Sequence, residues 1–485
     1  MFAFLFSYRI LFTWIKRSKN NKIKEAPEPG YSLPLIGHLH LLKGSEPFHH
    51  KLDAMADEFG PVFMLRLGAH RTLVVTGSEA LKECFTTNDR ALASRPSSAV
   101  GEYLCYNHML FGIAPYGPYW RELRKISMIH LLSNHRLQML KHVRATEIDE
   151  RMKGLYRQWV ENHGRPIKVE MKQWLHDLNF SIMSKMVLGT RFVGAKEESE
   201  GKELQRLIGE FFRLLRVFVV SDAFPFLKWM DWKGQKKIMK MIAVEIDCII
   251  GKLLAEHRCR RVKGDKGKDK DFMDVMLSIM EDAPLSVYDT DKVIKATALG
   301  IMIPASDTTS ATLAGALSAL LNNTHILKKA RDELDTHVGK SRHVDESDIK
   351  NLTYLQAIIK ETLRIGPAGS LFPMHEATQD CQIGGYHVPA GTRLLVNLGK
   401  GPVDVKGQQF EYLPFGSGRR SCPGVSFAMQ VMHLSLARLI HGFELEVPVG
   451  APRIDVRESL RLDNPKSTPV EVLFTPRLPN HLYED

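Results

Sequence analysis

The chain has 485 residues, and its composition, 44% hydrophobic and 25% charged, is ordinary for a globular protein. Lysine and arginine number 66 against 55 aspartate and glutamate, a net charge of +11 that suits an anionic lipid or an acidic protein partner. Nothing in the sequence resembles a nucleic-acid-binding module, so no nucleic-acid partner is expected. None of the six cysteines forms a CxxC pair, which argues against a zinc ribbon.

Residues 1–15 form an apolar run that contains Arg9 and is followed by a cluster of lysines and arginine. A helix that spans a membrane needs about 20 apolar residues, so this run is short, and the basic residues behind it favour a cytosolic location for the rest of the chain. We interpret residues 1–25 as a short N-terminal membrane anchor with a basic patch. A cleaved signal peptide is disfavoured because its charges would precede the apolar run. Residues 26–40 contain three prolines and predict a stiff hinge.

The body of the chain predicts a mainly α protein with small β-sheets, an α+β fold. Apolar residues recur at intervals of three and four over 119–254 and again over 272–280, the spacing of amphipathic helices. The charged, glycine-containing run 257–271 predicts a solvated loop. Strand-like stretches occur in a hairpin pattern at 61–67 and 72–76, and again at 385–396 and 470–474.

Residues 291–321 predict one long apolar helix, and its centre reads Pro304-Ala305-Ser306-Asp307-Thr308-Thr309. A membrane span is disfavoured, because Asp307 and the hydroxyl groups beside it would be costly in lipid. A buried helix that crosses the core fits better, and an acid beside a hydroxyl in its groove suits proton delivery away from bulk water. Pro304 removes one helical N–H at a cost of about 3 kcal/mol or more, so the helix either tolerates a kink here or displaces Thr308, and the sequence leaves both outcomes open.

Two further pairs have spacings that suit a binding site. Glu361 and Arg364 lie three apart at the end of a helical pattern and can face each other, although an exposed pair contributes only a few tenths of a kcal/mol. Trp120 and Arg124 have a WxxxR spacing, and a guanidinium matches a carboxylate through two hydrogen bonds. Taken alone, each pair is better explained by a surface or core role.

The segment Phe415 to Gly424 (FGSGRRSCPG) places Cys422 in a glycine-built turn before an apolar helical run. Backbone N–H groups and a helix N-terminus both stabilise a thiolate, which is a nucleophile or a metal ligand. A lone cysteine in such a turn is more often a structural one. A cysteine hydrolase is the alternative of another class, since the chain has 20 histidines that include potential bases.

The spacing of five residues around this cysteine resembles the haem-binding signature of the cytochrome P-450 monooxygenases. The matching positions are Phe415, Gly418, Arg420, Cys422 and Gly424. The resemblance implies that the Cys422 thiolate is the axial ligand of the iron of haem b. It places the haem between the long central helix and the helix after the cysteine loop.

The resemblance also assigns roles to the other pairs. Asp307 and Thr308 would deliver protons during oxygen activation. Glu361 and Arg364 would lock the haem-side core together with a third arginine. The residues expected to hold haem propionates or to shape the pocket are Trp120, Arg124, His375 and Arg420.

The anchor, basic patch and hinge are typical of microsomal members of this family. Residues 41–485 would then form the catalytic domain, facing the cytosol from the endoplasmic reticulum membrane. Tracts such as Ala91 to Pro96 and Leu413 to Gly424 resemble plant A-type enzymes, closest to those that oxidise alkaloids, coumarins, flavones and terpenoids. The implied reaction is oxidation of a small apolar or aromatic plant metabolite. The implied electron source is NADPH-cytochrome P-450 reductase, since the chain has no flavin or nicotinamide fingerprint.

One departure from the family lies after Asn397. The family continues through a PERF-type segment that carries the third arginine, whereas this chain runs directly into the cysteine loop, and only 58 positions separate Arg364 from Cys422 (422 − 364). A buried charge pair that loses its third member is destabilised by roughly a few kcal/mol. The alternative function is therefore a catalytically impaired or haem-free remnant, caused by a deletion between Asn397 and Gly407.

Overall fold

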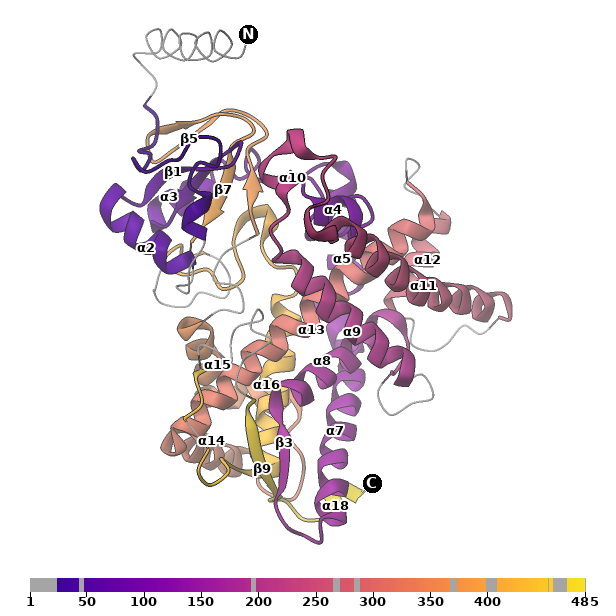
Figure 1. The fold of residues 1–485 in the computed structure, drawn as a ribbon. Helices are drawn as coiled ribbons and strands as arrows, with labels where there is room; N and C mark the ends of the chain where they lie inside the picture. The colour runs from indigo at the N-terminus through magenta and orange to yellow at the C-terminus, as the bar shows by residue number, and fades with distance from the viewer. Residues whose placement is uncertain are drawn as a thin grey trace, which may run out of the picture. The chain divides into compact units, whose positions relative to one another are not determined.

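The structure is a computed structural model, in which the described residues fall into two compact units (Figure 1). The described ranges are 24–42, 48–192, 198–264, 271–282, 288–366, 373–397, 408–451, 453–456 and 469–484. The units comprise Met1–Pro96 with Leu371–Gly399, and Ser97–Ser370 with Lys400–Asp485. Nearly all of the predicted anchor, and the stretch after Asn397 where the PERF-type segment is missing, lie outside the described residues. None of the helices searched within those ranges has the length and apolarity to cross a membrane.

The first unit is built on a four-stranded sheet in the order β1-β2-β7-β4. The hairpin predicted from the sequence is confirmed: β1 (Val62–Leu67) and β2 (His70–Val75) pair antiparallel, with Leu67 opposite His70. Gly68 in the turn has a φ of 66°, which glycine adopts at little cost. β7 (Arg393–Val396) pairs parallel to β2, and β4 (His375–Glu376) pairs antiparallel to β7.

One helix of the first unit, α2 (Phe48–Phe59), packs on this sheet. Leu52 and Met55 of α2 pack on Phe63 and Leu65 of β1 in a small apolar core. The remaining elements are η1 (Leu39–Leu42), α3 (Ser78–Phe85) and the hairpin β5 (Cys381–Ile383) with β6 (Tyr386–Val388).

The second unit is mainly helical, as the sequence predicts. Its helices in the first half are α4 (Ala99–Tyr103), α5 (Pro118–His130), α6 (Asn134–Met139), α7 (Lys141–Glu161), α8 (Met171–Leu188), α9 (Glu198–Leu215), α10 (Val220–Ala223), η2 (Pro225–Leu227), η3 (Trp232–Gly234) and α11 (Gln235–Val262). Those in the second half are α12 (Phe272–Asp282), α13 (Thr290–Asn322), α14 (Thr324–His337), η4 (Glu346–Asn351), α15 (Thr353–Ile365), η5 (Gly418–Arg420), α16 (Val425–Gly442) and α18 (His481–Glu484).

The long helix predicted over 291–321 is confirmed as α13, which runs through this unit and packs against α8, α15 and α16 (Figure 1). Most of its residues are buried, because apolar and small side chains occupy all of its faces. Pro304 lies inside α13 without ending it, so the helix is continuous from Thr290 to Asn322. The continuous helix therefore keeps Asp307 and Thr308 within regular helical turns.

A three-stranded antiparallel sheet, in the order β3-β9-β8, completes the second unit. Its strands are β3 (Ile167–Glu170), β8 (Phe443–Glu446) and β9 (Glu471–Pro476). In the register of the sheet, Phe474 lies opposite Ile167 on one side and opposite Leu445 on the other, and all three are buried. The strand expected at 470–474 is therefore confirmed as the central strand of this sheet.

The solvated loop expected over 257–271 is wrong at both ends. α11 continues to Val262, and His257 is 1% exposed and Asp271 7% exposed. The His257 ring contacts the Asp274 carboxylate over 2.8 Å and the Leu188 carbonyl over 2.9 Å. A run of charged residues predicts a solvent-exposed loop only if its charges have no partners in the fold. Here the end residues, His257 and Asp271, are buried and lie 3.7 Å apart.

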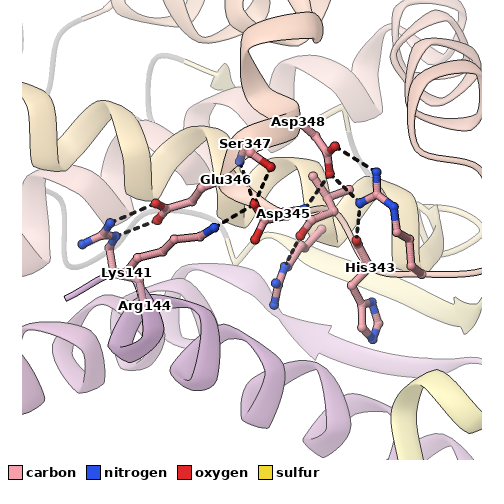
Figure 2. A network of polar contacts seen from close by, with 10 residues as sticks. Lys141, Arg144, His343, Asp345, Glu346, Ser347 and Asp348 are labelled. Atoms are coloured by element: carbon pink, nitrogen blue, oxygen red, sulfur yellow. Dashed lines mark hydrogen bonds and ion pairs between the residues drawn. The ribbon is translucent and has the colours of Figure 1, made fainter. Parts of the chain in front are cut away.

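Ionic contacts also join the start of α7 to η4 (Figure 2). Arg144, whose side chain is 0% exposed, forms two hydrogen bonds with Glu346, at 2.8 and 3.0 Å. Lys141 donates to Asp345 over 2.8 Å, and Asp345 in turn caps η4 by accepting from the Ser347 N–H. Burial alone would raise the pKa of Asp345, but the hydrogen bonds from Lys141 and Ser347 outweigh it and hold that pKa well below the usual range.

Candidate functional site

Cys422 lies in a tight loop immediately before α16. Its backbone N–H donates to the Phe415 carbonyl over 2.8 Å, which closes the loop. Gly416 and Gly418 have φ values of 71° and 66°, in the left-handed region that side chains disfavour. Gly424 is the N-cap residue of α16. The glycines of the sequence signature thus let the chain turn sharply, so that Cys422 sits just before the first turn of the helix.

The Cys422 side chain is partly exposed, and its surroundings act on the thiol in opposite directions. Burial raises the pKa of Cys422, while the backbone N–H of Gly424 and the positive charge of Arg124 lower it by less. The loop and helix end expected to favour a thiolate are present, but burial outweighs them. A bound metal cation would supply the missing stabilisation, since metal coordination deprotonates a thiol outright.

Trp120 lies against an arginine of the cysteine loop. It is 3% exposed, and its indole N–H donates to the Phe111 carbonyl over 3.1 Å. The Arg420 guanidinium lies over the indole at 4.2 Å from the ring centroid and donates to the Ala114 carbonyl over 2.5 Å. This cation–π contact fixes the direction of the Arg420 side chain.

Arg124, one helical turn after Trp120 on α5, reaches the residue that precedes Cys422. Its guanidinium donates to the Ser421 carbonyl over 2.9 Å and to the Ser421 hydroxyl over 3.1 Å. It also lies 5.5 Å from the Trp120 ring centroid. The structure therefore brings Trp120, Arg124, Arg420 and Cys422 together, and two guanidinium groups give this locus the charge that suits carboxylate groups.

The centre of α13 carries the second part of the predicted site. Pro304 is exposed, and Ala305 and Thr308 are partly exposed, on a helix that is otherwise largely buried. The Thr308 hydroxyl donates to the Pro304 carbonyl over 2.7 Å, so the two residues one turn apart are linked. α13 continues through Pro304, and Thr308 lies within the same helix.

Asp307, the residue before Thr308, is directed toward α8. Its carboxylate lies 3.0 Å from the Nε2 atom of His176 on that helix. Sequence reasoning missed His176, because a single histidine within an amphipathic helical pattern gives no sign of the residue it will face. Asp307 and Thr308 are thus consecutive residues with different hydrogen-bond partners.

Arg364 forms a bidentate ion pair with Glu361 on α15, with contacts of 2.7 and 2.6 Å. The pair is exposed: 43% of the Arg364 side chain and 53% of the Glu361 side chain are accessible. Hydrogen bonding to Arg364 lowers the pKa of Glu361. The segment before the cysteine loop meets α15 through another residue, Tyr412, whose hydroxyl donates to the Leu363 carbonyl.

His375 belongs to the first unit, on β4. It is buried, its Nδ1 atom hydrogen-bonds to the Leu92 carbonyl over 2.8 Å, and its ring contacts Phe85 edge to face at 5.7 Å. These contacts fix the orientation of the ring within its own unit. Its role at a haem stays a prediction.

Comparison with known proteins defines the family. The cytochrome P-450 family model matches residues 27–401 and 399–470, so the chain belongs to that family. It is 46% identical to xanthotoxin 5-hydroxylase of Arabidopsis thaliana, over 99% of this chain and 98% of the relative. It is 47% identical to demethylepipodophyllotoxin synthase of Sinopodophyllum hexandrum (96% and 95% covered) and 44% identical to strychnine-10-hydroxylase of Strychnos nux-vomica (98% and 95% covered).

The expectations of a cytochrome P-450 fold, a monooxygenase and a haem b cofactor are therefore confirmed. The residues around Cys422 also fit the cofactor chemically. A thiol just before a helix N-terminus suits iron, and two guanidinium groups beside an indole suit the carboxylates of the porphyrin. A cysteine hydrolase would need a histidine base, and the groups that shift the Cys422 pKa, among the described residues, include none.

Proposed function

We propose that this chain hydroxylates a small aromatic or apolar plant metabolite of the coumarin, lignan, flavonoid or alkaloid kind, with dioxygen and electrons from NADPH-cytochrome P-450 reductase. The observation that carries the proposal is the convergence of Arg124 and Arg420 on Trp120 beside Cys422. The substrate range follows from the printed activities of relatives that align along nearly the whole chain. The reaction consumes two protons and two electrons for each molecule of dioxygen and releases water with the hydroxylated product.

Each residue of the site has a role in this proposal. Haem b, when bound, supplies the iron at which dioxygen is activated. The Cys422 sulfur is the ligand of that iron, and Phe415, Gly418 and Gly424 hold the loop that presents it. The carboxylates of the cofactor would be held by Trp120, Arg124 and Arg420. Asp307 and Thr308 hold and pass protons on α13, a helix that is otherwise largely shielded from water.

The carbon monoxide difference spectrum of the reduced protein tests the cofactor part of the proposal. The wild-type protein should give the band of a thiolate-ligated haem, and Cys422→Ala should lose it. Cys248→Ala is a matched control, since Cys248 is an exposed cysteine on α11. A wild-type spectrum that coincides with that of Cys422→Ala would favour the impaired, haem-free remnant instead.

Turnover tests the activity itself. With the plant reductase and NADPH, wild-type protein should convert at least one probe from the set xanthotoxin, a flavone and strychnine to a product heavier by one oxygen atom. Isotopically labelled dioxygen should appear in that product. A protein that binds haem but leaves all three probes unchanged would contradict the proposed substrate range.

We also propose that the chain works at the endoplasmic reticulum membrane. Besides the predicted anchor, the segment between α10 and α11 exposes three large aromatic side chains, Phe226 (67%), Trp229 (78%) and Trp232 (60%). Lys228 and Lys233 alternate with them. Aromatic residues interspersed with lysines are typical of surfaces that lie in the lipid headgroup region.

Binding to vesicles of phosphatidylcholine and phosphatidylserine checks the membrane part. The double variant Trp229→Ser/Trp232→Ser should bind several-fold less than wild type, because both indoles lose their contact with lipid. Val262→Ser is the matched control, since Val262 is 88% exposed at the end of α11, outside the aromatic segment. Equal binding by all three proteins would remove this segment from the proposal.

A further inference from the structure

The contact between α8 and α13 carries a row of polar side chains inside an otherwise apolar interface. His176 Nε2 lies 3.0 Å from the Asp307 carboxylate, and the Asn179 amide donates to the Ser310 hydroxyl over 3.1 Å. In both pairs the two partners are 131 residues apart in the chain. The two helices therefore run in the same direction, and each keeps one face in contact with the other over this stretch. Asp307 is therefore held on the face of α13 that meets α8.

His176 links the interior of this interface to solvent. Its side chain is 24% exposed and that of Asp307 is 14% exposed. The imidazole stacks on Phe180, with ring centroids 6.4 Å apart and planes inclined by 10°, and this contact limits its rotation. The partly exposed imidazole thus stacks on Phe180 and has its Nε2 atom on the Asp307 carboxylate.

Charges around the ring favour its protonated form. Burial alone would lower the pKa of His176, but the hydrogen bond to Asp307 and the negative charges of Asp307 and Asp177 outweigh it, so the pKa is raised. Asp177, the neighbour on α8, is itself balanced by Arg151 of α7 over 3.0 Å and accepts from Gln205 of α9 over 3.1 Å. Asp307 is therefore the carboxylate that His176 contacts directly.

We propose that His176 is a positioning residue for the proton delivery described above: it holds the Asp307 carboxylate and keeps it supplied with protons from solvent. The inference rests on the proposed function and deepens it. In the step itself a hydronium ion protonates Nδ1 of the neutral imidazole, and the proton on Nε2 passes to Oδ1 of Asp307, which leaves the ring neutral with its proton on Nδ1. Loss of that proton to water and uptake of another at Nε2 restore the starting tautomer. The protonated carboxyl of Asp307 is then the proton donor that α13 presents, next in the chain to Thr308, whose hydroxyl is engaged with the Pro304 carbonyl.

The competing explanation is a structural His–Asp pair that only fastens α8 to α13. The two explanations differ in their dependence on charge. A structural pair tolerates any side chain that donates one hydrogen bond, whereas a proton supply needs a group that ionises near neutral pH. His176→Gln keeps a donor and cannot ionise, so this substitution separates them.

The first arm of the experiment needs no turnover. In the intact protein, the ring signals of His176, assigned by comparison with His176→Gln, report its pKa by NMR titration. Asp307→Asn should lower that pKa by about one unit, because it removes the facing charge. His130, a partly exposed histidine at the end of α5, should titrate unchanged. A His176 pKa that does not move would overturn the proposal.

The second arm measures product formed per NADPH consumed as a function of pH, with whichever probe the wild-type protein converts. In the wild type this yield should fall as pH rises through the His176 pKa. His176→Gln should lower the yield several-fold with little change in KM, and its profile should lose that limb. His130→Gln should match the wild type. Equal profiles for wild type and His176→Gln would mean that the pair is structural only.

The two arms also separate this inference from the proposed function. A wild-type protein that binds haem and converts no probe contradicts the proposed substrate range, and the NMR arm alone then decides whether Asp307 sets the pKa of His176. A wild type that converts a probe with the same pH profile as His176→Gln overturns only the role of His176.

Discussion

Two bidentate arginine–glutamate pairs in the helical unit have nearly the same contact distances and very different surroundings. Arg144 and Glu346 are 0% and 9% exposed and join α7 to η4 (Figure 2). Arg364 and Glu361 are 43% and 53% exposed and belong to one turn of α15. Both pairs have contacts between 2.6 and 3.0 Å. Contact geometry alone therefore does not show which pair contributes more to stability.

Burial decides how much each pair matters. In water, two opposite charges at contact gain little, because solvent screens them and ordering two long side chains costs entropy. In the interior, each charge needs its partner, and losing the partner leaves an unpaired ion out of water. The family resemblance singles out the exposed pair for its role in the haem-side core. The buried pair carries no family signature, yet it is the one on which stability should depend.

The largest effect is expected from breaking the buried pair. Glu346→Gln leaves the Arg144 guanidinium charged and fully enclosed, and should lower the free energy of unfolding by about 3–5 kcal/mol. The measurement is urea denaturation followed by circular dichroism. Glu203→Gln is the matched control, because Glu203 pairs with Arg206 at the surface, and it should change stability far less than Glu346→Gln does. Equal losses in both variants would refute the ranking by burial.

The cluster of His257, Asp271 and Asp274 extends the comparison between buried and exposed charges, because the charge of this buried site changes with pH. Burial raises the pKa of Asp271 to about 6, although His257 opposes the rise. A carboxyl whose folded-state pKa is raised stabilises the fold when protonated. That contribution is complete below its unfolded value near 3.8 and is lost as pH rises through about 6.

Asp271→Asn should remove this dependence while its side-chain oxygen still accepts from the Asp274 N–H. Between pH 4 and pH 7 the stability of wild type relative to Asp271→Asn should fall by roughly 1–3 kcal/mol. Urea denaturation at several pH values checks this. A constant difference across that range would mean that Asp271 stays ionised throughout.

Much of the fold could be predicted from the sequence, since it follows from local patterns. The hairpin at β1 and β2 and the helix α13 have periodicities that no tertiary contact overrides. The end of α11 could not be predicted, because its charges looked solvated and their partners come from other elements. Asp274 lies on α12, and the Leu188 carbonyl belongs to α8.

The residues of the candidate site also fall into those that a local pattern predicts and those that depend on tertiary packing. Cys422 and the glycines around it could be found because their spacing is local and is imposed by one tight turn. Trp120 and Arg124 followed from a spacing on one helix. His176 could not be found, because its meeting with Asp307 depends on how α8 and α13 pack. The exposure of Glu361 was equally hidden, since a spacing of three fixes which side chains meet and leaves open what covers them.

The smallest effect is expected at the exposed pair. Glu361→Gln should lower the free energy of unfolding by at most a few tenths of a kcal/mol, because both charges already contact water and solvent replaces the lost bond. The carbon monoxide difference spectrum should also stay unchanged, with Glu203→Gln as the control for an exposed helical pair elsewhere. A decrease in the free energy of unfolding close to that of Glu346→Gln, or disappearance of the haem band, would contradict this prediction. Glu361 and Arg364 would then act as the lock of the haem-side core that the family resemblance implies.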